Sequence, residues 1–282
     1  MRPYWSRTAI IGHAAGAQRQ PLMLDPIDPL YVLSGFVVGV LVGLTGIGGG
    51  SLMTPLLILV FGVHPATAVG TDLLYAAITK SGGTLFHGFA RSIDWRVVGR
   101  LASGSIPMTV LTLLFLSRVD RDDPGVGDLI KTALGIALFL TAGVLVFRQR
   151  ILARYSAHVS ALQPRSIVLY TVAMGAVIGV LVSLSSVGAG AIGAMCLVLL
   201  YPQMTMARIV GSDIAHAVPL TLAAGMGHWW LGSTDWVLLT SLLVGSLPGI
   251  LLGSYFCSRV PDGALRMILA VTLTVVAVRL LI

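Results

Sequence analysis

Apolar runs alternate with short polar connections along the chain, and ten such runs can be separated. Their approximate bounds are 30–45, 50–62, 66–88, 96–117 and 128–147 in the first half, and 166–184, 189–201, 206–231, 236–257 and 263–282 in the second. A helix needs about 20 residues to cross the hydrocarbon core of a bilayer. The pattern therefore predicts an all-α polytopic membrane protein.

Composition strengthens this prediction. Of the 282 residues, 56% are hydrophobic and 10% are charged, against roughly 25% charged in an ordinary soluble domain. A soluble enzyme, a disordered chain and a secreted disulfide scaffold are excluded. The net charge of +7 does not indicate a nucleic-acid partner, because the basic residues are scattered between apolar segments, as topology signals are. Cys196 and Cys257 both lie in apolar stretches without a CxxC pair, so we expect packing residues rather than a disulfide or a metal site.

The two halves of the chain resemble each other. Residues 43–50 match 183–190 at an offset of 140, and Gly70-Thr71-Asp72 matches Gly211-Ser212-Asp213 at an offset of 141. This agreement predicts an internal duplication. Five segments per half mean that the halves enter the membrane from opposite sides, which is an inverted repeat. The predicted parts are an N-terminal arm 1–29, a first repeat 30–147, a basic linker 148–165 and a second repeat 166–282.

The distribution of basic residues predicts the orientation. With the linker in the cytoplasm, ten basic residues lie on the cytoplasmic side and four on the other. The positive-inside rule favours this arrangement, although three arginines of the N-terminal arm run against it. We expect both termini outside and the protein in the inner cell membrane.

Two of the segments are too short to span the bilayer. Segments 50–62 and 189–201 have 13 residues each, and each follows a turn rich in small residues. We therefore expect each of these segments to be the second arm of a re-entrant hairpin, with the tip of the hairpin near mid-membrane. Helix N-termini at such tips offer N–H donors and partial positive charge to an anion. The candidate substrate-binding residues at the tips are Thr45, Gly46, Gly48, Gly49, Gly50, Ser51, Ser185, Ser186, Gly188 and Gly190. The alternative is that the glycines only permit close helix packing, as the GxxxG pairs elsewhere in the chain do.

The residues around the first tip resemble the sulfite exporter family TauE/SafE, also called TSUP. The resemblance rests on Gly43-Leu44-Thr45-Gly46-Ile47-Gly48-Gly49-Gly50, Pro55 and Ala68-Val69-Gly70-Thr71, and it recurs around residues 183–213. It implies a transporter of small sulfur-containing anions or organosulfonates, with possible coupling to an ion such as a proton. The second half departs from the family pattern, because Ser186 and Ala189 stand where glycine is usual and Met195 where proline is usual.

Three ionisable residues are predicted to lie deep in the membrane, where they are costly and usually functional. Asp72 and Asp213 occupy matching positions in the repeats, and they either serve coupling or cap the starts of their helices. Lys80 is expected near mid-depth, where it binds the anion or pairs with Asp213 or another group. His216 shares a helix face with Asp213 and either relays a proton or makes a structural hydrogen bond. His87 and His228 lie near segment ends beside tryptophans, which predicts membrane-interface positions.

The leading functional prediction is a carrier of a small anionic sulfur compound, such as sulfite, thiosulfate or an organosulfonate, by alternating access. It needs no cofactor and no metal, its other partner is the lipid bilayer, and the sequence leaves its oligomeric state open. A channel-like anion pore is the first alternative. An intramembrane enzyme is far less favoured, since there is no HExxH motif and no Ser–Lys or Ser–His arrangement stands out.

Overall fold

The computed structural model of the protein describes residues 27–45, 49–89, 91–119, 124–160, 163–256 and 262–282. In these ranges the chain is helical, without strands. The first half contains α1 (Pro29–Thr45), a short 3-10 helix η1 (Gly49–Leu52), α2 (Met53–Leu59), α3 (Pro65–Phe89), α4 (Trp95–Leu116) and α5 (Pro124–Ser160). The second half contains α6 (Pro164–Ser185), α7 (Ala191–Leu200), α8 (Met206–Trp230), α9 (Trp236–Phe256) and α10 (Asp262–Leu281).

The helices confirm the all-α membrane fold. Five of them, α4, α5, α6, α8 and α9, are long and apolar enough to cross a bilayer, and α1, α7 and α10 contain shorter apolar stretches. Each of the ten predicted segments corresponds to an α-helix, and the bounds agree within a few residues except at the end of α5, which continues well past residue 147. The predicted arm 1–29 lies almost entirely outside the described residues.

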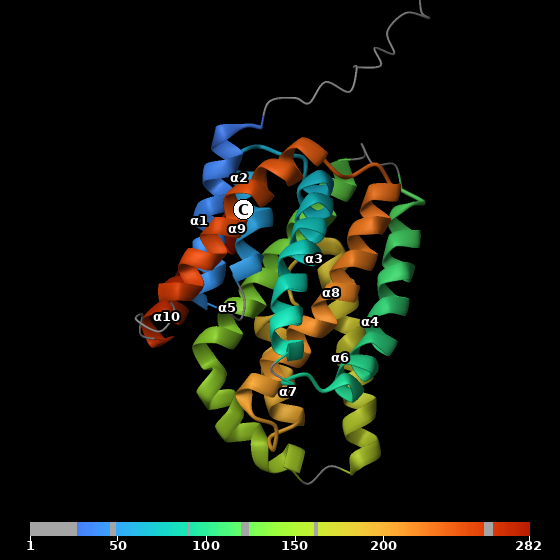
Figure 1. The fold of residues 1–282 in the computed structure, drawn as a ribbon. Helices are drawn as coiled ribbons and strands as arrows, with labels where there is room; N and C mark the ends of the chain where they lie inside the picture. The colour runs from blue at the N-terminus through green and yellow to red at the C-terminus, as the bar shows by residue number, and fades with distance from the viewer. Residues whose placement is uncertain (1–26, 46–48, 90, 120–123, 161–162, 257–261) are drawn as a thin grey trace, which may run out of the picture.

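Helix pairing joins the two halves throughout the bundle. Helix α1 packs along α9 and α4 packs along α6, while α3 packs on α8 and α5 on α10. In the duplication, α1 corresponds to α6, α3 to α8, α4 to α9 and α5 to α10. Replacing each helix by its counterpart turns the α1–α9 pair into the α6–α4 pair and leaves the α3–α8 and α5–α10 pairs unchanged. Figure 1 shows α3 and α8 side by side in the middle of the bundle. This pattern is what an inverted duplication requires, and the inverted relation itself stays a prediction.

Glycines set the close approach of the paired helices. A Cβ on Gly104 of α4 would lie 2.0 Å from the Val172 carbonyl oxygen of α6, and one on Gly245 of α9 would lie 1.8 Å from the Val32 carbonyl oxygen of α1. An added Cβ would likewise lie less than 3 Å from backbone of the facing helix at Gly39, Gly43, Gly175 and Gly179. For these glycines the packing interpretation holds, since small residues let helix backbones touch in lipid.

We expect Gly104→Ala to destabilise the protein strongly, because the added methyl group meets backbone atoms that cannot move independently of α6. Gly99 lies on the same helix, where an added Cβ would meet nothing within 4 Å, so Gly99→Ala is the matched control. Thermal unfolding in detergent should show a loss of several degrees for Gly104→Ala and no loss for Gly99→Ala. Equal melting temperatures would show that α4 and α6 do not pack through this glycine.

The predicted linker is largely helical. Helix α5 has 37 residues and continues to Ser160, so its length is about 55 Å, against a hydrocarbon core of about 30 Å. We therefore expect the end of α5 that carries Arg148, Arg150 and Arg154 to extend beyond the hydrocarbon. Figure 1 shows the C-terminal end of α5 at the bottom of the bundle. Only a few residues separate α5 from α6.

Candidate functional site

The second tip is a tight irregular turn between α6 and α7. Ser186 has φ 58°, Gly188 has φ 127° and Gly190 has φ 135°. The last two values lie where residues with a Cβ are strained, so glycine is needed at both positions. Helix α7 begins at the next residue, Ala191, so its N-terminus starts at the tip as predicted.

Ser185 holds this tip together. Its hydroxyl donates to the Leu181 carbonyl at 2.6 Å and accepts from the Val187 N–H at 3.2 Å. The hydroxyl proton is therefore used inside the turn. Ser186 differs, because its Oγ is buried and has no hydrogen-bond partner in the described part of the chain.

The first tip is described only in part. Gly46 and Gly48 lie outside the described residues. Thr45 ends α1, and Gly49 and Gly50 begin η1. Ser51 is buried within η1. The chain therefore changes helix type immediately after the predicted tip, before α2 begins.

Asp72 is buried beside the start of α2. It is fully buried as the eighth residue of α3, and its Oδ2 accepts a hydrogen bond from Thr54 Oγ1, at the start of α2. The Ser186 hydroxyl of the second tip lies beside the same carboxyl group. Asp213 is likewise the eighth residue of α8, whose start is capped by Thr205 instead. The interpretation of the two aspartates as helix caps is therefore wrong.

Lys80 reaches the second tip from α3. It is the sixteenth of 25 residues in α3, and its Nζ donates to the Ala189 carbonyl at 3.5 Å. The ammonium group interacts electrostatically with both Asp213 and Asp72. Neither carboxylate forms a direct salt bridge with it in the described ranges. Lys80 thus interacts with two acidic groups without close contact with either.

Asp213 packs against α7. A Cβ on Gly193 would lie 2.2 Å from Asp213 Oδ1, so a larger residue at 193 would displace the carboxyl group from its position. Neither Asp213 Oδ1 nor Asp72 Oδ1 has a hydrogen-bond partner among the described residues. A buried polar atom without a partner costs about 1–3 kcal/mol. The centre formed by Asp72, Lys80 and Asp213 therefore contains polar atoms to which water or a ligand would hydrogen-bond.

His216 forms a hydrogen bond with Ser105 and not with Asp213, the neighbour on its own helix face. Its Nε2 lies 2.8 Å from Ser105 Oγ of α4, and the ring is fully buried. The Nδ1 atom has no partner in the described chain. The structural hydrogen bond is thus present, and it joins α8 to α4 rather than His216 to Asp213.

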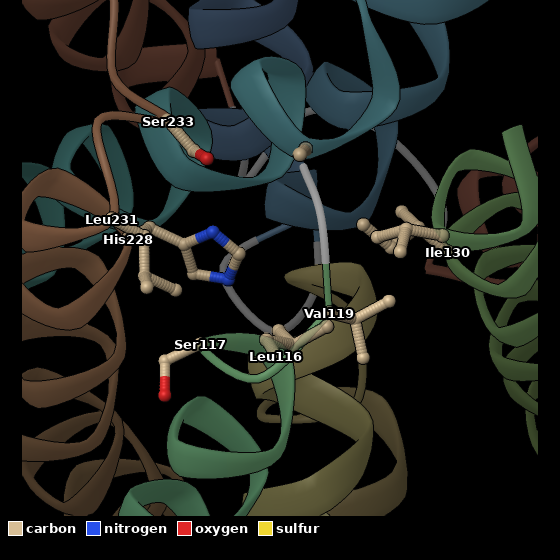
Figure 2. A pocket seen from close by; sticks show the side chains of 9 residues that line it. Leu116, Ser117, Val119, Ile130, His228, Leu231 and Ser233 are labelled. Carbon is tan, nitrogen blue, oxygen red and sulfur yellow. The ribbon is translucent and has the colours of Figure 1, made fainter. Parts of the chain in front are cut away.

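A pocket lies at the opposite end of the bundle from the linker. Its volume is about 280 Å³, and the ends of α3, α4, α5 and α8 line it. Figure 2 shows the His228 imidazole projecting from α8 among apolar side chains such as Leu116 and Ile130. The prediction of an interface position for His228 is wrong, because the residue is 1% exposed and its Nε2 donates to the Ser183 carbonyl at 2.9 Å. This bond connects the pocket wall to α6 two residues before the second tip. The His87 side chain lies outside the described part.

Comparison with known proteins identifies the family. The sequence pattern of the sulfite exporter TauE/SafE family matches residues 31–280. The chain belongs to this family. It is 39% identical over 254 residues to the probable membrane transporter protein YjnA of Bacillus subtilis, covering 89% of this chain and 98% of that one. It is 26% identical to the probable membrane transporter protein YdhB of the same organism, over 89% of this chain and 99% of that protein. No solved structure matches the chain significantly.

This TauE/SafE protein also uses two hydroxyl residues that the sequence analysis did not single out. The Asp235 N–H donates to Thr71 Oγ1 at 3.0 Å, and the Asp94 N–H donates to Ser212 Oγ at 2.8 Å. Each hydroxyl precedes a buried aspartate and holds the start of a helix in the other half. The signal in the sequence was that two motifs recur together at the offset of 141. One is Gly-Thr/Ser-Asp at 70–72 and 211–213, and the other is Asp-Trp at 94–95 and 235–236.

Cys196 is free and half-buried in α7, in keeping with a packing role, while Cys257 lies outside the described residues.

Proposed function

We propose that this membrane transporter carries small sulfur-containing anions, such as sulfite, thiosulfate or organosulfonates, across the inner cell membrane. The observation that carries the proposal is the Lys80 ammonium group in the middle of α3, at the carbonyl oxygen of the second tip. An anion that leaves water for a site of low dielectric needs a compensating charge. Lys80 supplies it, and the N–H groups at the start of α7 supply hydrogen bonds.

The charges around Lys80 support coupling to a proton. One ammonium and two ionised carboxylates have a net charge of −1, which repels an anion. Protonation of one carboxyl group makes the centre neutral. Thr54 donates a hydrogen bond to one oxygen of Asp72, whereas neither oxygen of Asp213 accepts a hydrogen bond from the described residues. Asp213 is therefore the proposed proton acceptor, and the anion would enter together with a proton.

The outer approach to this site is proposed to be the pocket at His228. Its wall is bonded to α6 close to the second tip, so a local movement of α8 against α6 would connect pocket and tip. Alternating access would then expose the site between the tips to one side at a time, as in other transporters built from inverted repeats.

The experiment that tests the proposal is a binding screen on purified protein. Sulfite, thiosulfate and sulfoacetate are titrated while the melting temperature is followed, with chloride at the same ionic strength as the control. A ligand that binds only the folded state raises the melting temperature with its concentration. We expect a saturable rise with at least one sulfur anion and none with chloride. No rise with any of them would reject the substrate class.

The orientation is tested by labelling a single cysteine at position 156 of α5, in a background without Cys196 and Cys257. The arginine distribution predicts that an impermeant thiol reagent added to intact cells leaves this cysteine unlabelled, and that it reacts once the membrane is opened. Labelling from outside in intact cells would show that the orientation is opposite to the predicted one.

A further inference from the structure

The described chain has a second pocket, at the end of the bundle where the basic linker lies. Its volume is about 360 Å³, and it is lined by Arg100, Pro164, Arg165, Ile167, Val168 and Tyr201. These residues come from the start of α4, the start of α6 and the end of α7. It shares no lining residue with the pocket at His228 or with the site around Lys80.

The pocket contains positive charge without an acidic partner. Arg100 Nη1 donates to the Tyr201 hydroxyl at 3.2 Å, and that hydroxyl also bonds to Thr171 at 2.8 Å. Neither Arg100 nor Arg165 forms a salt bridge in the described ranges. Arg208, at the same end of the bundle, is by contrast paired with Asp94 at 3.2 Å. The two pocket arginines therefore keep their charge available to a ligand.

The start of α6 adds to the positive electrostatic potential of this pocket. Pro164 is its first residue, and Gln163 before it makes no side-chain capping bond. The N–H groups of a first turn without a side-chain cap, together with the helix dipole, favour an anion. Two arginines and a helix N-terminus thus line one pocket, which suits a phosphate-like oxyanion.

The depth of the pocket indicates where such an oxyanion comes from. Trp95, at the start of α4, is 66% exposed, as expected for an aromatic residue at the membrane–water interface. Arg100 is five residues further along, about 7.5 Å on the helix axis. Side chains of a helix lean toward its N-terminus, so a long arginine side chain at this position extends back toward the interface, where lipid phosphates lie. Ile167 and Val168 give the pocket an apolar wall next to the basic groups. A lipid phosphate with its acyl chains fits this combination better than a fully hydrated ion does.

We propose that this pocket binds the phosphate headgroup of an anionic phospholipid, through Arg100, Arg165 and the N-terminus of α6. Basic pockets between transmembrane helices on the cytoplasmic side are suited to such headgroups. The bound lipid ties the starts of α4 and α6 to the end of α7, which is the second arm of the second hairpin.

The test compares lipids and variants on purified protein. Retention of phosphatidylglycerol and phosphatidylcholine is measured by native mass spectrometry for the wild type, Arg165→Gln and Arg150→Gln. Arg165→Gln leaves the Arg100–Tyr201 bond in place, so the fold is preserved. Arg150 stacks on Phe147 at the same end, outside the pocket, and its variant is the control. At about 1 kcal/mol for each basic group, Arg165→Gln should weaken retention of phosphatidylglycerol about fivefold, and Arg150→Gln should not change it.

A second arm distinguishes the sources of the oxyanion. Inorganic phosphate is titrated against protein carrying phosphatidylglycerol. No competition at millimolar concentration supports a lipid, while full displacement of phosphatidylglycerol by phosphate would reject the lipid as the occupant. Equal retention of phosphatidylglycerol by the wild type and Arg165→Gln would overturn the site. Lys80→Gln is expected to leave lipid retention unchanged, so the result is independent of the transport site.

Discussion

Replacing Lys80 with glutamine is expected to lower the affinity for the transported anion by about ten- to a hundredfold. A hydrogen bond to a charged group contributes about 1.5–3 kcal/mol, which corresponds to that range. Glutamine is shorter than lysine and neutral, so it brings no charge to the site. The measurement is ligand-induced stabilisation of the purified variant.

Two further observations keep this prediction falsifiable. Lys80→Arg preserves the charge and should retain part of the affinity. The unliganded melting temperature should fall only slightly for Lys80→Gln, because Lys80 makes one long hydrogen bond and no direct salt bridge in the described chain. Unchanged affinity in a well-folded Lys80→Gln would remove the residue from the site. A large stability loss with unchanged affinity would assign it a purely structural role.

Replacing Gly190 with alanine is expected to abolish transport with a smaller effect on membrane insertion. At φ 135° a residue with a Cβ is strained by about 1–3 kcal/mol. The strain falls on the residue that precedes α7, so we expect the tip to relax and to lose the Ala189 carbonyl contact with Lys80. Uptake into proteoliposomes and elution from size-exclusion chromatography measure the two effects separately.

Gly82 provides the matched control for this variant. It lies two residues from Lys80 on α3, with nothing within 4 Å of an added Cβ and no positive φ. Gly82→Ala should transport at the wild-type rate. Wild-type transport by Gly190→Ala would mean that the geometry of the second tip does not serve the anion.

The order and extent of the helices were predictable from sequence because they depend on local patterns. Segment 236–257 corresponds to Trp236–Phe256, and segment 206–231 to Met206–Trp230. The GxxxG spacing on α6 and α9 likewise predicted the close contact of helices. These features are determined by composition and by the period of a single helix.

The partners of the buried polar groups could not be predicted in the same way. Helical periodicity places His216 and Asp213 on one face, but it does not say which helix faces them. The partner of His216 is Ser105, 111 residues away, and that of His228 is the Ser183 carbonyl, 45 residues away. The position of Lys80 at the second tip also depends on how α3 packs against the other half. Such contacts follow from the tertiary arrangement.

Counterflow in proteoliposomes tests the central claim of a mid-membrane carrier for small sulfur anions most directly. Vesicles containing the protein are loaded with unlabelled sulfite or thiosulfate and diluted into a trace of the labelled anion. An alternating-access carrier predicts transient accumulation of label above equilibrium, which Lys80→Gln abolishes. Simple equilibration of label without an overshoot would indicate a channel, and the absence of protein-dependent entry for any sulfur anion would contradict the account.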